Sequence, residues 1–241
     1  MTMTTTTPNA KGPVLVVGAT GKVGRRVVQK LLASNRPVRA LVRNKQKAQS
    51  VLGTSDELPY PPLEIVECDL GTATLDDLSP HVEGCSAIVS VSGALRFSRW
   101  TDFVPWRLLS PKANWSKDVT THPYYLNSVA QTKLIDLAST HRIPRFVRLT
   151  GLSCGLSPFS PVSILFNTLL SLTTKWHLQT EDYLRASNVP YVILRPGGLA
   201  DSERVSLVVL FIVWLWLFVC LVCTLSVECC VSHHCLCRQS Y

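Results

Sequence analysis

The first 55 residues of this 241-residue chain contain no aspartate or glutamate, although they carry ten of its 24 lysines and arginines. The remaining 186 residues hold 14 basic and 16 acidic side chains, so the formal net charge of +8 arises at the N-terminal end. The same 55 residues also lack any aromatic side chain. Single-stranded nucleic acids are usually bound by basic groups combined with aromatic stacking platforms. We therefore expect no nucleic-acid partner and look for a smaller ligand that carries phosphate.

Charge is nearly absent from residues 205–241, where only Glu228 and Arg238 are ionised. Residues 207–225, LVVLFIVWLWLFVCLVCTL, contain none. As a helix this segment spans roughly 28 Å, close to the ~30 Å hydrocarbon core of a bilayer. No signal peptide precedes the first apolar run, and the Thr-rich residues 1–12 are expected to be disordered. These features predict a domain at 13–204 that lies in the cytoplasm or plastid stroma. If the hydrophobic segment 207–225 is genuine, the chain is a single-pass, tail-anchored membrane protein.

A second interpretation of residues 205–241 is a retained intron. The composition changes abruptly at Val205-Ser206, a dipeptide whose codons can spell a splice-donor sequence. A transcript that is continuous through the stop codon after Tyr241 would contradict this hypothesis. Six of the nine cysteines lie here, but their spacing, CC-x-x-HHC-x-C, matches no usual zinc pattern, so we predict no metal site. In an anchored protein these cysteines are candidates for palmitoylation.

Apolar runs alternate with amphipathic segments through residues 13–204. Strands are predicted at 13–18, 38–43, 63–69, 86–93, 145–150 and 190–198. Helices are predicted at 21–35, 45–52, 126–141 and 176–188, with a helical turn at 76–78. Residues 94–125 form an irregular insertion that contains tryptophan and proline. This alternation predicts an α/β fold, a doubly wound parallel sheet of the Rossmann type.

A glycine-rich turn, Gly18-Ala-Thr-Gly21-Lys-Val-Gly24, joins the first predicted strand to the first predicted helix. Gly18 permits the tight turn, Gly21 lets backbone amides approach a pyrophosphate, and Gly24 allows close helix–sheet packing. The helix N-terminus adds N–H donors and partial positive charge. The spacing is G-x-x-G-x-x-G rather than G-x-G-x-x-G, but the strand–turn–helix context makes it informative. It predicts a dinucleotide site formed by Gly18, Thr20, Gly21, Lys22, Val23 and Gly24.

The end of the second predicted strand indicates which dinucleotide binds. NAD-binding domains usually place a carboxylate there, to accept from the ribose 2′-hydroxyl. Here the strand ends at Arg43, followed by Lys45 and Lys47, and no carboxylate precedes Asp56. A guanidinium matches a 2′-phosphate, so the sequence favours NADP over NAD as the cofactor.

Several segments together resemble the atypical short-chain dehydrogenase/reductase group, the NmrA-like NAD(P)-binding domain family of plants, algae and bacteria. They are VLVVGATGKVGRRVVQKLL, RALVRN, ECDL, LIDLASTHRIPRFVRLTGLS and EDYLRASNVPYVILRPGGL. The resemblance implies that Asp69 and Leu70 contact the adenine and that Ser90, Val91 and Ser92 line the cofactor. It also implies that Arg195 and Pro196 close the pocket near the nicotinamide. A family member would continue into a substrate-binding region, which the hydrophobic segment here replaces.

The catalytic pattern of the classical members is absent, because none of the six tyrosines is followed four residues later by lysine. Thr150, Ser153 and His177 remain as weak candidates for orienting or protonating a carbonyl. Two functions stay open. One is an NADPH-dependent oxidoreductase or isomerase acting on a small organic substrate. The other is a non-catalytic NADP(H)-sensing or assembly module that binds a protein partner. Either would associate with a membrane through 207–225 if that segment is genuine.

Overall fold

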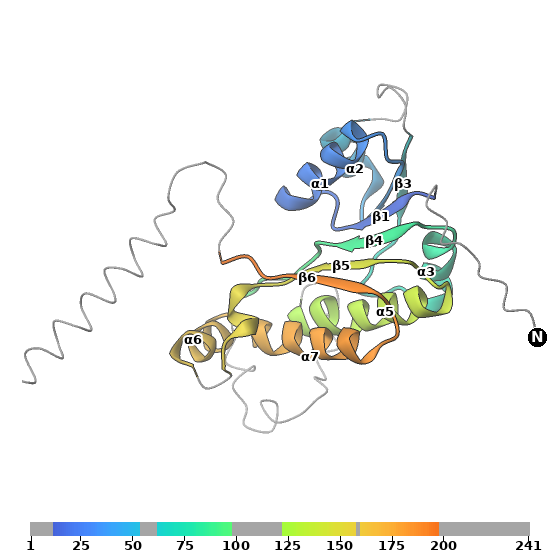
Figure 1. Ribbon diagram of the computed structural model, residues 1–241. Helices are drawn as coiled ribbons and strands as arrows, with labels where there is room; N and C mark the ends of the chain where they lie inside the picture. Colours follow the sequence, from blue (N-terminus) through green and yellow to red (C-terminus); the bar gives the residue numbers. More distant parts are fainter. Residues whose placement is uncertain (1–11, 54–61, 98–121, 158–159, 198–241) are drawn as a thin grey trace, which may run out of the picture. The chain divides into compact units, whose positions relative to one another are not determined.

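A computed structural model describes residues 12–53, 62–97, 122–157 and 160–197. Within these residues six strands form one parallel sheet in the order β3-β2-β1-β4-β5-β6 (Figure 1). The strands are β1 (Val14–Val17), β2 (Val38–Val42), β3 (Leu63–Glu67), β4 (Ala87–Ser90), β5 (Phe146–Leu149) and β6 (Tyr191–Leu194). The strand order reverses between β1 and β4, which is where doubly wound sheets bind ligands. The predicted fold class is confirmed.

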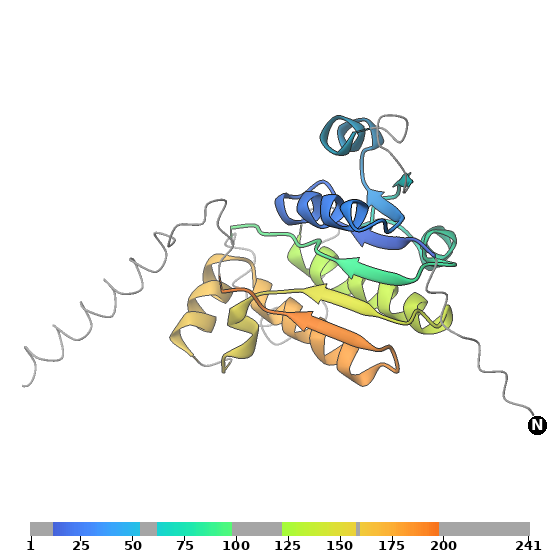
Figure 2. The ribbon, with the colours of Figure 1, turned by 45° about the horizontal axis from the view of Figure 1, so that its top comes forward.

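Helices cover both faces of the sheet (Figures 1 and 2). One face carries α1 (Lys22–Ala33) and α2 (Lys45–Leu52) over a core of small β-branched side chains such as Val16, Val28 and Val38. The other carries α3 (Leu75–Val82), α5 (Ala130–Thr140) and α7 (Thr173–Ala186) over larger residues, among them Leu134 and Phe146. Because both faces are covered, β1 is buried at every position.

Local sequence explains where most elements begin. Thr74 caps α3, and the Asp77 side chain returns a bond to the Thr74 amide, which completes a capping box. Asn44 caps α2 by accepting from the Lys47 amide at 2.7 Å. The predicted turn at 76–78 is therefore a full helix, α3, which tolerates Pro80 in its interior.

Three features differ from the sequence predictions or lie outside the described residues. The helix predicted at 126–141 starts earlier, with a wide π-helical turn, η2 (Tyr124–Val129), that runs into α5. A 3₁₀ turn, η3 (Leu152–Gly155), and helix α6 (Pro161–Leu169) were not predicted. Most of the 94–125 insertion and all of 198–241, with the 207–225 segment, fall outside the described residues. Among the helices that are described, none is long and apolar enough to cross a membrane.

Candidate functional site

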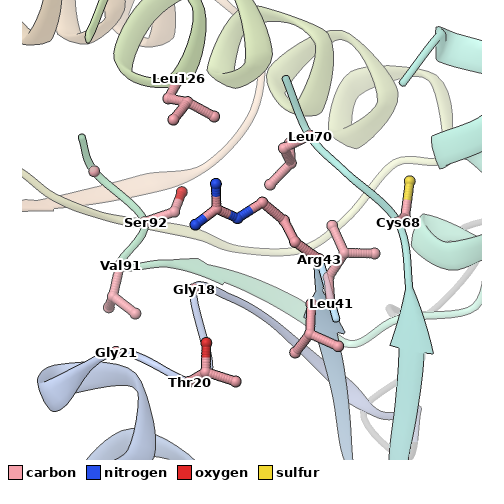
Figure 3. A pocket seen from close by; sticks show the side chains of 12 residues that line it. Gly18, Thr20, Gly21, Leu41, Arg43, Cys68, Leu70, Val91, Ser92 and Leu126 are labelled. Carbon is pink, nitrogen blue, oxygen red and sulfur yellow. The ribbon is translucent and has the colours of Figure 1, made fainter. Parts of the chain in front are cut away.

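A cleft of about 220 Å³ opens at the carboxyl ends of the strands, around the point where the strand order reverses (Figure 3). Its walls come from the β1–α1 turn, the end of β2, the segment after β3, the segment after β4 and η2. The lining residues are Gly18, Thr20, Gly21, Leu41, Val42, Arg43, Cys68, Leu70, Val91, Ser92, Gly93 and Leu126. The fold therefore brings together five segments that are far apart in the chain.

The glycines of the β1–α1 turn allow backbone contacts that no side chain would permit. Gly18 has a φ of +86°, and a Cβ there would lie 2.8 Å from the Cα of Ser92. A Cβ on Gly24 would lie 2.1 Å from the carbonyl oxygen of Gly18. The Gly21 amide donates to that same oxygen at 3.0 Å and closes the turn. The turn therefore exposes backbone without side chains, which is what allows a pyrophosphate to approach its amides closely.

The N-terminus of α1 adds positive potential to the cradle. Gly21 occupies the N-cap position, and among the described residues no side chain caps the helix. The first turn also lacks an acidic residue, so the helix dipole is not offset there. Such a terminus favours an anion close to its N–H groups. Lys22, Val23 and Gly24 belong to this first turn and lie beside the lining rather than within it.

Arg43 is the charged side chain of the lining. It is exposed, follows the end of β2 and points into the cleft in Figure 3. None of the described residues that line the cleft is acidic. The nearby carboxylate of Glu67 accepts from the Lys45 amide at 3.3 Å, outside the lining. The position at which an NAD-binding domain offers a carboxylate to the ribose therefore carries a cation.

The two residues implied to contact adenine have different locations. Leu70 lines the cleft. Asp69 does not, because its side chain folds back to accept from the Gly71 amide at 3.0 Å, while its carbonyl accepts from Ala73 at 2.8 Å. Asp69 instead lines a separate open hollow with Glu67 and Asp77. Its observed role is to shape the turn that presents Leu70.

The segment after β4 also divides into lining and support. Val91 and Ser92 line the cleft, whereas Ser90 is fully buried beneath it. The Ser90 hydroxyl donates to the Gln131 side chain at 2.6 Å and accepts from Arg148 at 2.9 Å. Gln131 in turn donates to the Ser92 hydroxyl at 3.0 Å. A buried polar network therefore holds this wall of the cleft in place.

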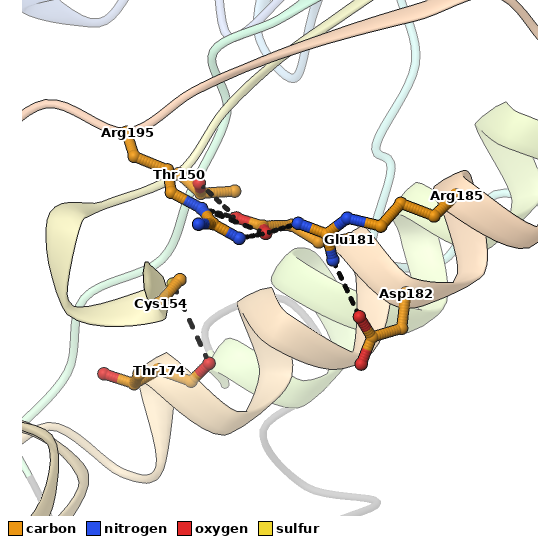
Figure 4. Close-up of polar contacts among 7 residues, drawn as sticks. All are labelled: Thr150, Cys154, Thr174, Glu181, Asp182, Arg185 and Arg195. Carbon is orange, nitrogen blue, oxygen red and sulfur yellow. Dashed lines mark hydrogen bonds and ion pairs between the residues drawn. The ribbon is translucent and has the colours of Figure 1, made fainter. Parts of the chain in front are cut away.

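Arg195 lies outside the cleft lining and is bound to Glu181 of α7 (Figure 4). The Glu181 side chain is fully buried and also accepts from Thr150 at 2.6 Å and from Arg185 at 2.7 Å. Burial alone raises the pKa of Glu181, but the bonds from Arg195, Thr150 and Arg185 outweigh it and hold the pKa below its usual value. Arg195 and the adjacent Pro196 are thereby tied to the α7 side of the sheet.

The three catalytic candidates have three different sets of partners. The Thr150 hydroxyl donates to Glu181, so its hydrogen is already used. The Ser153 hydroxyl lies 3.2 Å from that of Thr174. The Nδ1 atom of His177 lies 3.3 Å from Nη2 of Arg148. The structure therefore does not join them into one hydrogen-bonded acid–base pair.

Arg148 and Glu181 organise this region, yet sequence reasoning gave neither a role. Arg148 lies in β5 and is fully buried, and Glu181 lies on the buried face of α7. One signal existed for Arg148, since a charged residue inside a strand that is covered on both faces is rare unless it has partners. For Glu181 the helical pattern gave no comparable signal, because charged residues are common on amphipathic helices.

Comparison with known proteins defines the class. Residues 18–211 match a family described as NAD(P)H-binding, and the chain belongs to that family. It is an NmrA-like NAD(P)-binding domain with relatives among the atypical short-chain dehydrogenases/reductases and epimerases, as its motifs predicted.

Three similar proteins illustrate the range of this class. The chloroplastic protein TIC 62 of Arabidopsis thaliana is 31% identical over 198 residues, which cover 77% of this chain and 27% of that protein. Sanguinarine reductase of Eschscholzia californica is 27% identical over 205 residues, which cover 78% of this chain and 70% of the reductase. The crystal structure of the oxidoreductase ylbE from Lactococcus lactis superposes with a TM-score of 0.55 at 18% identity, over 79% of this chain and 71% of ylbE. This last likeness shows a shared fold.

Proposed function

We propose that this domain binds NADP(H) in preference to NAD(H), and that Arg43 contacts the 2′-phosphate. In this arrangement the pyrophosphate rests on the Gly18–Gly24 turn and the N-terminus of α1. The adenosine half lies toward Arg43 and Leu70, and the nicotinamide half lies toward Val91, Ser92 and Gly93. The observation that carries the proposal is a cleft whose described lining contains a guanidinium and no carboxylate.

We further propose an NADPH-dependent oxidoreductase that acts on a small organic carbonyl compound in the plastid stroma. The family, the resemblance to sanguinarine reductase and the chloroplastic relatives support this proposal. When bound, the cofactor supplies hydride. The chain's own residues bind its phosphates at the turn, orient its nicotinamide half against Gly93 and hold a hydrogen-bonding side chain, His177, next to that end.

A second candidate function is an NADP(H)-sensing module that docks on a protein partner without turnover. Two observations favour it. The tyrosine–lysine pair of classical reductases is absent from the sequence. The hydroxyl of Thr150 is bonded to the buried Glu181 rather than presented to a ligand. Steady oxidation of NADPH by the full chain across a panel of aldehydes, ketones and quinones would support the enzyme, and no turnover across a broad panel would support the sensor.

The cofactor preference is tested by calorimetry with NADPH and NADH on the wild type and on Arg43→Ala. We expect NADPH to bind at least about tenfold tighter than NADH, a difference of about 1.4 kcal/mol. The Arg43→Ala variant should lose most of this difference while its affinity for NADH changes little, because only the 2′-phosphate contact is removed.

Arg145→Ala is the matched control. Arg145 is an exposed arginine just before β5, at the opposite end of the sheet from the cleft, so its removal should leave the preference unchanged. Equal affinities of the wild type for NADPH and NADH would contradict the assignment to NADP.

A further inference from the structure

Arg148 is a buried cation that forms no ion pair with the carboxylates of the described residues. It is 0% exposed, and the described residues offer it no carboxylate within ion-pair distance. Its Nη1 donates to the Ser90 hydroxyl at 2.9 Å and to the Ser92 carbonyl at 2.8 Å, and its Nη2 lies 3.3 Å from Nδ1 of His177. Its Nε is enclosed without a hydrogen-bond partner. Burying a cation without a partner charge lowers the stability of a protein. The presence of Arg148 here therefore points to a role beyond packing.

The contact with Arg148 fixes the state of His177. A guanidinium has donors and no acceptor, so Nδ1 of His177 must accept, and the hydrogen of the neutral ring must sit on Nε2. A second proton on Nδ1 would set two N–H groups and two positive charges against each other. Burial first, and then the charge of Arg148, lower the pKa of His177 to about 3. A neutral ring with its hydrogen on Nε2 is thus the ground state.

The Glu181 carboxylate favours the charged form of Arg148, but Arg148 is the charge that shifts the pKa of His177. Glu181 lies one turn further along α7 and is engaged by Arg195, Arg185 and Thr150. Cys154 of η3 is a buried thiol whose pKa is raised by its burial, so it stays uncharged at neutral pH. From η2, the group beside His177 is the Asn127 amide, which has no charge. Arg148 is therefore the charge that acts on His177.

The donor atom of His177 lies directly behind the cofactor cleft. Gly93 lines the cleft, and a Cβ placed on it would lie 3.8 Å from Cε1 and 4.0 Å from Nε2 of His177. The side-chain oxygen of Asn127 lies 3.6 Å from the same Cβ position, so the imidazole edge and the Asn127 amide meet behind Gly93, which has no side chain to keep them from the cleft. His177 is half-buried, and its Nε2 has no hydrogen-bond partner among the described residues.

We propose that Arg148 is a positioning residue that holds His177 as a neutral Nε2–H donor, and that this N–H binds an oxygen of the nicotinamide-nucleoside half of the bound dinucleotide. This oxygen belongs either to the ribose or to the carboxamide, and each of these oxygens can accept a hydrogen bond from the Nε2–H group. The ligand half of the proposal rests on the proposed function. The Arg148–His177 half concerns the free protein and can be tested without any ligand.

The free protein is tested by long-range ¹H–¹⁵N NMR of ¹⁵N-histidine-labelled full-length chain, with the His177 signals identified by their loss in His177→Asn. We expect a neutral Nε2–H tautomer that does not titrate between about pH 5 and pH 8. In Arg148→Met, which replaces the cation by an apolar side chain, His177 should populate both tautomers. Its pKa should rise above that of the wild type, while the burial of the ring still holds it below the ordinary value. Arg148→Lys retains a charged donor and should preserve the neutral state at least in part.

Arg145→Met, at an exposed arginine three residues away, should leave the His177 signals unchanged. A wild-type His177 that titrates near pH 6.5, or that carries its hydrogen on Nδ1, would overturn the assignment. Unchanged tautomer and titration in a folded Arg148→Met protein would also overturn it. The wild-type spectra decide the question even if Arg148→Met does not fold.

The ligand half is tested by adding three probes to the same labelled protein. Adenosine 2′,5′-bisphosphate lacks the nicotinamide nucleoside and should leave the Nε2–H signal in place. NADP⁺ should shift it. 2′-Phospho-ADP-ribose carries the terminal ribose without the base, so a shift with this probe assigns the acceptor to the ribose, and no shift assigns it to the carboxamide.

Calorimetry on the same samples separates the two ways in which the proposal could fail. If NADP⁺ binds and the Nε2–H signal does not move, the ligand contact is wrong while the proposed function stands. If NADP⁺ does not bind, the proposed function and the ligand contact fail together, and the free-protein spectra still decide the role of Arg148.

Discussion

Gly24 and Gly84 are glycines for different physical reasons, and the difference can be measured. A Cβ at Gly24 would collide with the Gly18 carbonyl at 2.1 Å, so the backbone of α1 packs directly on the phosphate-binding turn. Gly84 has a φ of +72°, but no heavy atom lies within 4 Å of the position where its Cβ would be. The first glycine is required for space and the second for conformation.

We therefore predict that Gly24→Ala lowers the free energy of unfolding by about 2 kcal/mol through overpacking. It should also weaken NADPH binding at least about tenfold, because the α1 N-terminus must move away from the turn. Gly84→Ala should cost about 1 kcal/mol of backbone strain and leave NADPH affinity unchanged. Denaturant unfolding and calorimetry check both. Normal NADPH binding by Gly24→Ala would show that the turn does not hold the pyrophosphate.

The elements at the β5–β6 edge of the sheet meet at one carboxylate. Glu181 comes from α7, Thr150 follows β5 and Arg195 follows β6 (Figure 4). Because the Glu181 side chain is fully buried, its charge must be matched by these donors. We predict that Glu181→Gln lowers the free energy of unfolding by about 3 kcal/mol, since it leaves Arg195 without its partner charge.

Asp182 is the matched control for Glu181. It is the next residue on α7, and its side chain is 65% exposed and paired, among the described residues, with Arg185 alone. Asp182→Asn should change the free energy of unfolding by less than about 0.5 kcal/mol. Equal effects of the two substitutions in urea denaturation would mean that the buried network does not hold α7 to the sheet.

The elements that could be predicted from sequence are those whose pattern is local. All six strands fall within predicted apolar runs, because strands of a parallel sheet are short, continuous and rich in β-branched residues, even at β6, which is largely exposed. Helix α6 was missed because PVSILFNTL is short and has no charged residue, and such an apolar run cannot be assigned to a helix or a strand by its pattern alone.

The same limit applies to the site. The β1–α1 turn and Arg43 could be placed because a glycine turn and a strand end are local features. Asp69 and Arg195 could not be placed in this way, because another partner in the folded chain sets the position of each side chain. Asp69 accepts from the Gly71 amide, and Arg195 donates to the buried Glu181. Arg148 has partners from two segments, the end of β4 and α7, and only the folded chain brings these to β5.

At the scale of the whole molecule, the neutral His177 links stability to pH. In the unfolded chain a histidine binds its proton near pH 6.5, whereas in the folded protein burial, followed by Arg148, lowers the pKa of His177 to about 3. The unfolded state therefore binds more protons below pH 6.5, and stability must fall as pH falls from 6.5 toward about 3. Glu181, whose pKa is held below its ordinary 4.5, adds to the loss only below that value.

The two pH windows allow the contribution of His177 to be isolated. We predict that the free energy of unfolding of the wild type falls between pH 6.5 and pH 5 more steeply than that of His177→Asn, by up to about 1.4 kcal/mol per pH unit. Asparagine retains an acceptor for Arg148 but does not titrate. Below about pH 4.5 both proteins should lose further stability, because Glu181 then binds a proton in the unfolded chain but not yet in the folded one. The wild type should keep its steeper slope down to about pH 3. Urea denaturation at each pH measures these free energies. Parallel curves above pH 5 would mean that His177 binds its proton equally well in the folded and unfolded states. That outcome would contradict the role assigned to Arg148.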